Sequence, residues 1–148
     1  NYYTEIRKTF KNVKNFIFCA HPNSDFKELK IYLRDIKIVK FKTRHYIKRS
    51  KLVFFHESSS ILDAMYLNKN IILLNSNYLG KYFKYRSLLY SKLLNLKTFN
   101  LSKSSDRSTI SELINNRLIN IKINRKAIFS INSKKNGLLT IIDVLKNL

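Results

Sequence analysis

Four short apolar runs place the strongest constraint on the fold, because a polar cluster or a helical segment follows most of them. They cover residues 16–20, 36–41, 52–55 and 71–74. The connection between the third and fourth runs is long enough for the crossover that two parallel strands require, and residues 61–67 within it have helical periodicity. Strands that alternate with helices predict an α/β domain, with an open parallel sheet and helices on both of its faces.

The rest of the chain predicts more helices and one more strand. Tyr3, Ile6 and Phe10 lie at helical spacing in residues 2–11. Such spacing is typical of a short amphipathic helix. We further predict a strand over residues 98–101 and helices over residues 44–50, 82–94, 108–118 and 138–148.

Two of these helices have predicted caps. Thr43 is expected to cap the helix over residues 44–50. Ser108 or Thr109, together with Glu112, is expected to form a capping box for the helix over residues 108–118.

Length and residue usage predict one domain from a longer protein. The 148 residues can bury a single core without disulfides or metals, so residues 1–148 are expected to form one domain. The chain starts at Asn1 without an initiator Met, which favours a piece of a longer protein. The lone Cys19 favours a reducing compartment, so we expect a cytoplasmic location. We interpret Cys19 itself as a small buried hydrophobic residue.

The net charge allows two kinds of anionic partner. The chain has 29 Lys and Arg against 9 Asp and Glu, a formal charge of +20. Such a charge fits a nucleic acid or an anionic membrane surface. The basic residues are spread along nearly the whole chain, however, and the aromatic residues do not form a stacking platform. A nucleic-acid-binding module therefore stays an alternative, not the main expectation.

Glycine is too rare for two common nucleotide-binding loops. The chain has 2 Gly, and neither a Gly-x-Gly-x-x-Gly loop nor a P-loop is present. The dinucleotide-binding and P-loop NTPase classes therefore lose their main support.

Three polar clusters follow the first three predicted strands. They are His21-Pro22-Asn23-Ser24, Lys42-Thr43, and His56-Glu57-Ser58-Ser59-Ser60. In open parallel sheets, ligands bind outside the carboxyl ends of the strands. We therefore expect the three clusters to surround one cleft, where Lys42 would neutralise phosphate charge.

The third cluster predicts an anion site. The free N–H groups at a helix start and the positive end of its dipole attract a phosphate. Ser58, Ser59 and Ser60 would add hydroxyl donors, and Asp63 would reach ribose hydroxyls. The alternative is that one serine only caps the helix and Asp63 only complements its dipole.

The two histidines at neighbouring strand ends are candidates for phosphate contacts. His21 and His56 can each donate a hydrogen bond or, when protonated, supply a positive charge, although a lone histidine is more often structural. Zinc needs a third well-placed ligand, so we expect no metal and no cofactor other than the substrate nucleotide.

The order of these motifs resembles a family of bacterial glycosyltransferases. The resemblance covers roughly the first half of the chain and rests on residues 18–24, Lys42-Thr43, residues 46–53, residues 56–60 and residues 68–72. These segments are similar to the GT-B enzymes of surface-carbohydrate and capsule synthesis that have a His-Pro motif and a downstream serine motif, the polysialyltransferase-like group.

The resemblance implies a fold and a substrate. It implies the Rossmann-like, C-terminal donor-binding half of a GT-B fold, in which His21 and Ser24 face the donor phosphate and the serine loop binds it from the next helix start. CMP-activated sugars are the usual donors in that group. Asn23 stands where the family pattern has Arg, and Asn70 where Pro commonly follows Lys69.

The resemblance also implies what the chain lacks. The acceptor-side domain usually supplies the catalytic base, so this fragment alone is expected to bind donor weakly and to transfer nothing. The expected acceptor is a glycan or a lipid-linked glycan at the inner membrane face, where a basic surface is attracted to anionic lipid.

Two more hypotheses fit the same motifs. The first is transfer of a polyol phosphate from a CDP-linked donor, because such enzymes have similar His-Pro and serine elements. The second is a degenerate domain that kept the fold and lost the site, which the Asn23 departure allows.

Overall fold

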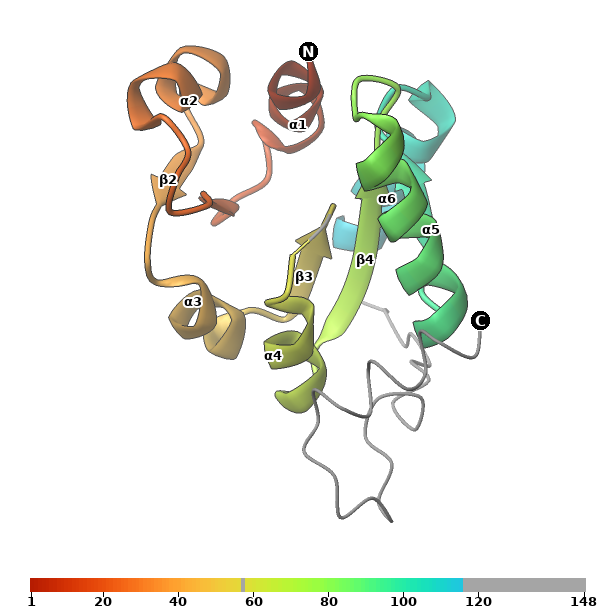
Figure 1. Cartoon of the computed structure of the whole chain (residues 1–148). Helices are drawn as coiled ribbons and strands as arrows, with labels where there is room; N and C mark the ends of the chain where they lie inside the picture. Colours follow the sequence, from red (N-terminus) through yellow and green to blue (C-terminus); the bar gives the residue numbers. More distant parts are fainter. Residues whose placement is uncertain (57, 116–148) are drawn as a thin grey trace.

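The computed structural model describes residues 1–56 and 58–115 and has an α/β fold (Figure 1). Its helices are α1 (Tyr2–Phe10), α2 (Phe26–Leu33), α3 (Thr43–Arg49), α4 (Ile61–Tyr66), α5 (Lys81–Leu94) and α6 (Ser104–Asn115). Its strands are β1 (Ile17–Cys19), β2 (Lys37–Val39), β3 (Leu52–Phe55), β4 (Asn70–Asn75) and β5 (Thr98–Asn100). The predicted alternation of strands and helices is confirmed.

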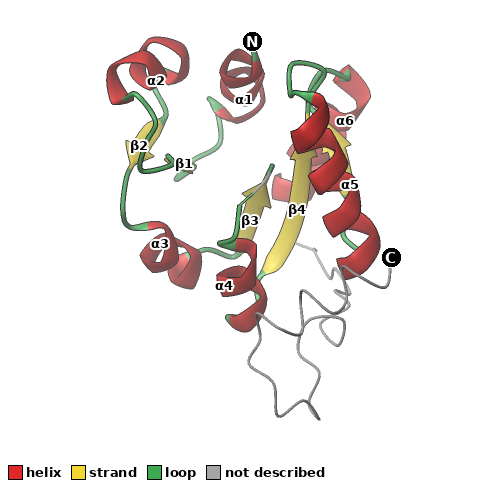
Figure 2. Cartoon of the chain, viewed as in Figure 1, coloured by secondary structure: helices red, strands yellow, loops and turns green. Residues whose placement is uncertain are grey.

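All strand pairs among the described residues are parallel, but they form two sheets (Figure 2). In the first sheet β1 pairs with β2, with Phe18 opposite Ile38. In the second sheet β4 lies between β3 and β5, with Val53 opposite Ile71 and Leu74 opposite Phe99. The prediction that the four apolar runs form one sheet is therefore wrong, because they divide between two sheets. The prediction that neighbouring strands run parallel is confirmed within each sheet.

Local backbone conformation keeps the strands of the first sheet short. Asn15 and Phe41 both have positive φ, at 65° and 61°, so the chain leaves extended geometry just before β1 and soon after β2. Pro22 follows β1 closely and has no N–H to continue a ladder. Each strand of this sheet is consequently three residues long and offers few backbone groups for a further partner.

Helices cover both faces of the second sheet, as predicted. Ile72 and Leu74 of β4 point into a core formed with α1, α2 and α6. Ile71 and Leu73 point the other way, into a core formed with α3, α4 and α5. This alternation is the period of two that a strand imposes on its side chains.

The first core also joins the two sheets. Phe16, beside β1, stacks on Phe10 of α1 with ring centroids 4.2 Å apart, and Phe54 of β3 lies 4.9 Å from the same Phe10 ring. Helix α1 therefore packs against the first sheet and the second sheet together.

Helix α2 was not predicted from the sequence. Its N-cap is Asp25, whose carboxylate accepts hydrogen bonds from the backbone N–H groups of Lys27 and Glu28. This is a standard side-chain cap, and Leu29 and Leu33 are the residues that the helix buries.

Two predicted caps are wrong. Lys42 is the N-cap of α3, so Thr43 lies inside the first turn and does not cap it. Helix α6 begins at Ser104, which places Ser108 and Thr109 in its interior and rules out their capping box. The Asp106 carboxylate instead accepts a hydrogen bond from the backbone N–H of Asn100, at 2.7 Å, and so joins the first turn of α6 to β5.

The predicted helix over residues 138–148 lies outside the described residues. Within residues 1–56 and 58–115, no helix has both the length and the apolar character needed to cross a bilayer.

Candidate functional site

The His-Pro loop after β1 is held by a lysine from the neighbouring strand end. Lys40, next to β2, donates hydrogen bonds from Nζ to the backbone carbonyl oxygens of Pro22 and Ser24. The His21 ring accepts a bond at Nδ1 from the N–H of Asn23, at 3.2 Å, and this fixes the ring against its own loop. The His21 side chain is exposed rather than buried in the core.

Thr43 links the second cluster to β1, the strand that precedes the first cluster. Its hydroxyl is hydrogen-bonded to the Cys19 thiol at the end of β1. Burial raises the pKa of that thiol, and the bond from Thr43 offsets part of the rise. Cys19 is half-buried rather than fully buried, but its raised pKa agrees with the interpretation of an inert thiol.

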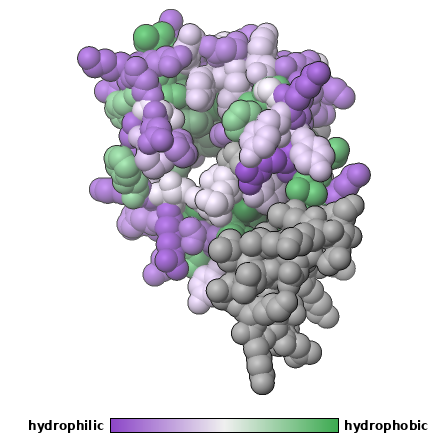
Figure 3. All heavy atoms as spheres, viewed as in Figure 1, coloured by the Kyte–Doolittle hydropathy of each residue, from purple (hydrophilic) through white to green (hydrophobic). Residues whose placement is uncertain are grey.

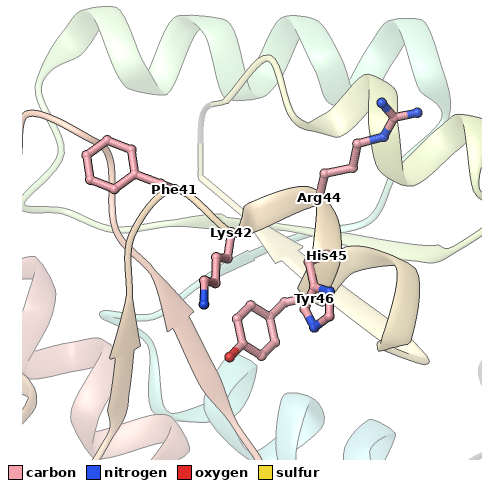
Figure 4. Close-up of a pocket in the computed structure, with 5 residues that line it drawn as sticks. All are labelled: Phe41, Lys42, Arg44, His45 and Tyr46. Carbon is pink, nitrogen blue, oxygen red and sulfur yellow. The ribbon is translucent and has the colours of Figure 1, made fainter.

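A shallow basic pocket lies at the start of α3 (Figure 4). It has a volume of about 310 Å³, and its lining consists of Phe41, Lys42, Arg44, His45 and Tyr46. The Lys42 and Tyr46 side chains extend in the same direction, whereas Arg44 points the opposite way (Figure 4). Of these residues only Lys42 was predicted as a site residue.

The pocket is next to the helix of the third cluster. Arg44 Nε lies 3.4 Å from Asp63 Oδ1, and this ion pair joins the first turns of α3 and α4. The two helices lie side by side (Figure 1). Hydrogen bonds thus tie the His-Pro loop to Lys40, which precedes α3 in the chain, and the ion pair ties α3 to α4. Asp63, predicted to reach a ribose, is engaged by Arg44 in this structure.

The serine cluster does not cap α4 in the ordinary way. Ser60 is the N-cap residue but makes no side-chain capping bond. The Ser58 hydroxyl accepts a hydrogen bond from the Ser60 N–H, at 3.2 Å, within the loop itself. Ser59 is exposed. Ser60 thus occupies the N-cap position, as the alternative interpretation has it, but without a side-chain capping bond, and the predicted contact with an anion stays a prediction.

His56 lies apart from the pocket. Its ring packs between two aromatic side chains, with centroid distances of 5.2 Å to Tyr2 of α1 and 6.5 Å to Phe83 of α5. The elements around His56 are therefore not those that form the pocket, and the structure does not place His56 with Lys42.

A second polar cluster, at the ends of β4 and β5, was missed from the sequence. Ser76, which is completely buried, donates a hydrogen bond to the Glu5 carboxylate of α1. The Ser102 hydroxyl accepts a bond from the Asn77 N–H at 2.8 Å, and Asn100 Nδ2 donates to Asn77 Oδ1 at 3.0 Å. Glu5 is 71 positions from Ser76, so no local sequence signal could have revealed this contact.

Comparisons with protein-family models, with curated proteins and with solved structures found no match to this chain.

Proposed function

We propose that this chain is the donor-binding domain of a glycosyltransferase that transfers a sugar from a CMP-linked donor to a surface-polysaccharide acceptor. The observation that carries the proposal is that Lys40 ties the His-Pro loop to the segment that leads into the basic pocket, while an ion pair ties α3 to the start of α4. Ligands of parallel α/β sheets bind beside the carboxyl ends of the strands, and His21 and Lys42 follow the ends of β1 and β2.

The pocket has the chemistry that a nucleotide requires. Lys42 and His45 supply cationic or hydrogen-bond-donating groups for a phosphate, while the rings of Phe41 and Tyr46 offer apolar surface for a base or a ribose. Both aromatic residues lie within five positions of Lys42, and Phe41 is 79 % exposed. Exposed aromatic rings next to cations are suited to stacking and charge neutralisation in one small site.

The His-Pro loop would also contribute to donor binding, although none of its residues lines the pocket. Lys40 holds the loop by its carbonyl oxygens, which leaves the exposed His21 ring edge available to the donor phosphate. Such preorganised positive groups would stabilise the leaving nucleotide phosphate during transfer. The catalytic base would come from the acceptor-side domain, and the acceptor would be a glycan or lipid-linked glycan at the cytoplasmic membrane face.

Calorimetry with CMP, CDP, UDP and GDP on the full-length protein tests this proposal. We expect the cytidine nucleotides to bind most tightly. Replacing Ser58, Ser59 and Ser60 together with Ala should weaken CMP binding roughly tenfold or more, because a hydrogen bond to a charged group contributes on the order of 1.5–3 kcal/mol. Replacing His21 with Ala should act in the same direction, because it removes a hydrogen-bond donor that the phosphate would contact.

A matched control comes from a second serine-rich helix start. Ser104, Ser105 and Ser108 of α6 are exposed, and their joint replacement by Ala should leave CMP binding unchanged. Equal affinity for all four nucleotides would reject the cytidine donor. If the Ser58–Ser59–Ser60 variant bound CMP as tightly as the control variant, the serine cluster would have no role in donor binding. A comparison of CMP-sugar with CDP-glycerol turnover separates sugar transfer from polyol-phosphate transfer.

A further inference from the structure

Large apolar side chains are exposed along one region of the surface, on and just before α5. Five of the eight exposed large hydrophobic side chains of the described residues are in this region: Tyr78, Tyr82, Phe83, Tyr85 and Leu88. Tyr85 is 67 % exposed and Leu88 is 53 % exposed, so neither contributes much to the core. Exposed apolar side chains that are grouped in one region mark an interaction surface more often than the same side chains scattered singly over the surface.

The same helix is strongly cationic. It carries Lys81, Lys84, Arg86 and Lys92 and no acidic residue. No Asp or Glu occurs in the sequence between Asp63 and Asp106. Among the described residues, no ion pair is formed by Lys81, Lys84 or Lys92, and a partner surface of negative charge complements these lysines.

Helix geometry gathers these features on one side. Lys81, Tyr85, Leu88 and Lys92 are spaced by four, three and four residues, which places them in one row along the helix. Ser87 and Leu94, on the opposite side, are fully buried where α5 packs on β4 and β5. The outward row thus has a tyrosine and a leucine at its centre and a lysine at each end. Figure 3 shows hydrophilic side chains interleaved with pale and hydrophobic ones on the visible face of the molecule.

Arg86 holds the adjoining tyrosine rings in place. Its guanidinium donates hydrogen bonds to the hydroxyl groups of Tyr82, at 2.8 Å, and Tyr90, at 3.2 Å. It also lies over both rings, 5.6 Å and 5.9 Å from their centroids. Because these rings are already fixed, less side-chain entropy is lost when they meet a partner.

We propose that the outward row of α5, with Tyr78 and Tyr82 beside it, docks on an anionic lipid bilayer. Tyrosine rings with polar tips are suited to the boundary between headgroups and acyl chains, and lysines are attracted to anionic headgroups. A leucine at the centre of the row favours a bilayer over a nucleic acid, because a phosphate backbone offers it no apolar contact. The row shares no residue with the pocket at α3, so the membrane proposal is tested separately from the proposed nucleotide binding.

Sedimentation with sucrose-loaded vesicles tests the proposal. The chain should bind vesicles that contain phosphatidylserine and should bind pure phosphatidylcholine vesicles weakly. The double change Lys81→Gln and Lys92→Gln should lower the partition coefficient on the order of 25-fold, since each lysine near an anionic surface contributes roughly fivefold. The double change Tyr85→Ser and Leu88→Ser should lower it roughly fivefold or more at unchanged charge.

The control is a double change of equal charge at Lys11 and Lys14, two exposed residues in the loop before β1. Replacing both with Gln should lower the partition coefficient less than roughly threefold, because screening limits the reach of each charge. Circular dichroism and thermal unfolding check that every variant is folded.

Four results would overturn the proposal. Equal losses from the two lysine pairs, or unaltered vesicle binding by the Tyr85 and Leu88 variant, would show diffuse attraction without a docking face. Loss of single-stranded RNA binding in that variant, with vesicle binding intact, would assign the surface to nucleic acid. A fall in the solution mass of the chain in that variant, with vesicle binding intact, would assign it to a second copy of the chain.

Discussion

The two sheets use the same parallel pairing but bury their strands to different extents. In the β3–β4–β5 sheet, the four central residues of β4 are each at most 3 % exposed. In the β1–β2 sheet no strand residue is fully buried, and Lys37 is exposed. The buried sheet is held by apolar contacts on both faces, whereas the other sheet is tied down partly by side-chain hydrogen bonds such as those of Lys40. The candidate site lies mainly with the less buried sheet, which is the region that can open or adjust most easily.

The largest expected effect on stability comes from a matched pair of core substitutions, one in each sheet. Ile72→Ala in β4 should lower the free energy of unfolding by about 2–5 kcal/mol, because Ile72 is fully buried and its removal leaves a cavity. Ile38→Ala in β2, at a half-buried site, should cost roughly 1 kcal/mol. Urea titration followed by circular dichroism measures both. Equal costs would show that the two sheets contribute alike to stability.

A smaller effect is expected from the buried polar cluster that joins α1 to the end of β4. Ser76→Ala removes the hydroxyl that donates to the Glu5 carboxylate, which leaves a buried acceptor short of a partner. The expected loss is about 1–3 kcal/mol in the free energy of unfolding. Ser105→Ala, at an exposed position of α6, is the control and should have no measurable effect. A Ser76 variant as stable as the control would mean that this cluster does not hold α1 in place.

The smallest effect concerns the His-Pro loop. Lys40→Met keeps most of the side-chain stem but removes both bonds to the loop carbonyl groups, so it should cost about 1 kcal/mol locally. Hydrogen exchange at the Asn23 and Ser24 amides should become roughly fivefold faster. Lys37→Met in β2 serves as the control, because the Lys37 ammonium lies over the Tyr46 ring and not over this loop. Unchanged exchange in the Lys40 variant would show that the loop does not need its lysine.

The pattern of apolar runs predicted nearly every element, because burial imposes a period of two on strands and about 3.6 on helices. Residues 52–55 are the clearest case, since the predicted strand and β3 have the same bounds. Helix α2 was missed although Asp25, Leu29 and Leu33 carry its cap and its buried face, so the signal was in the sequence and was not used. The predictions that Thr43 and Ser108 cap helices were wrong. Residues that can cap a helix occur at several positions near each helix start, and tertiary contacts decide at which of them the helix begins.

For the site, the sequence by itself located the polar clusters after β1, β2 and β3. Only the tertiary structure decided which members lie together: Lys40 against the His-Pro loop, Arg44 against Asp63, and His56 apart from the pocket between Tyr2 and Phe83. The division into two sheets and the contact between Glu5 and Ser76 were likewise decided in three dimensions. The physical reason is the distance in sequence over which each effect acts. Periodicity and turn chemistry depend on residues that are near neighbours in the chain. The contacts named above depend on how whole helices pack, and one local sequence pattern is compatible with several packing arrangements.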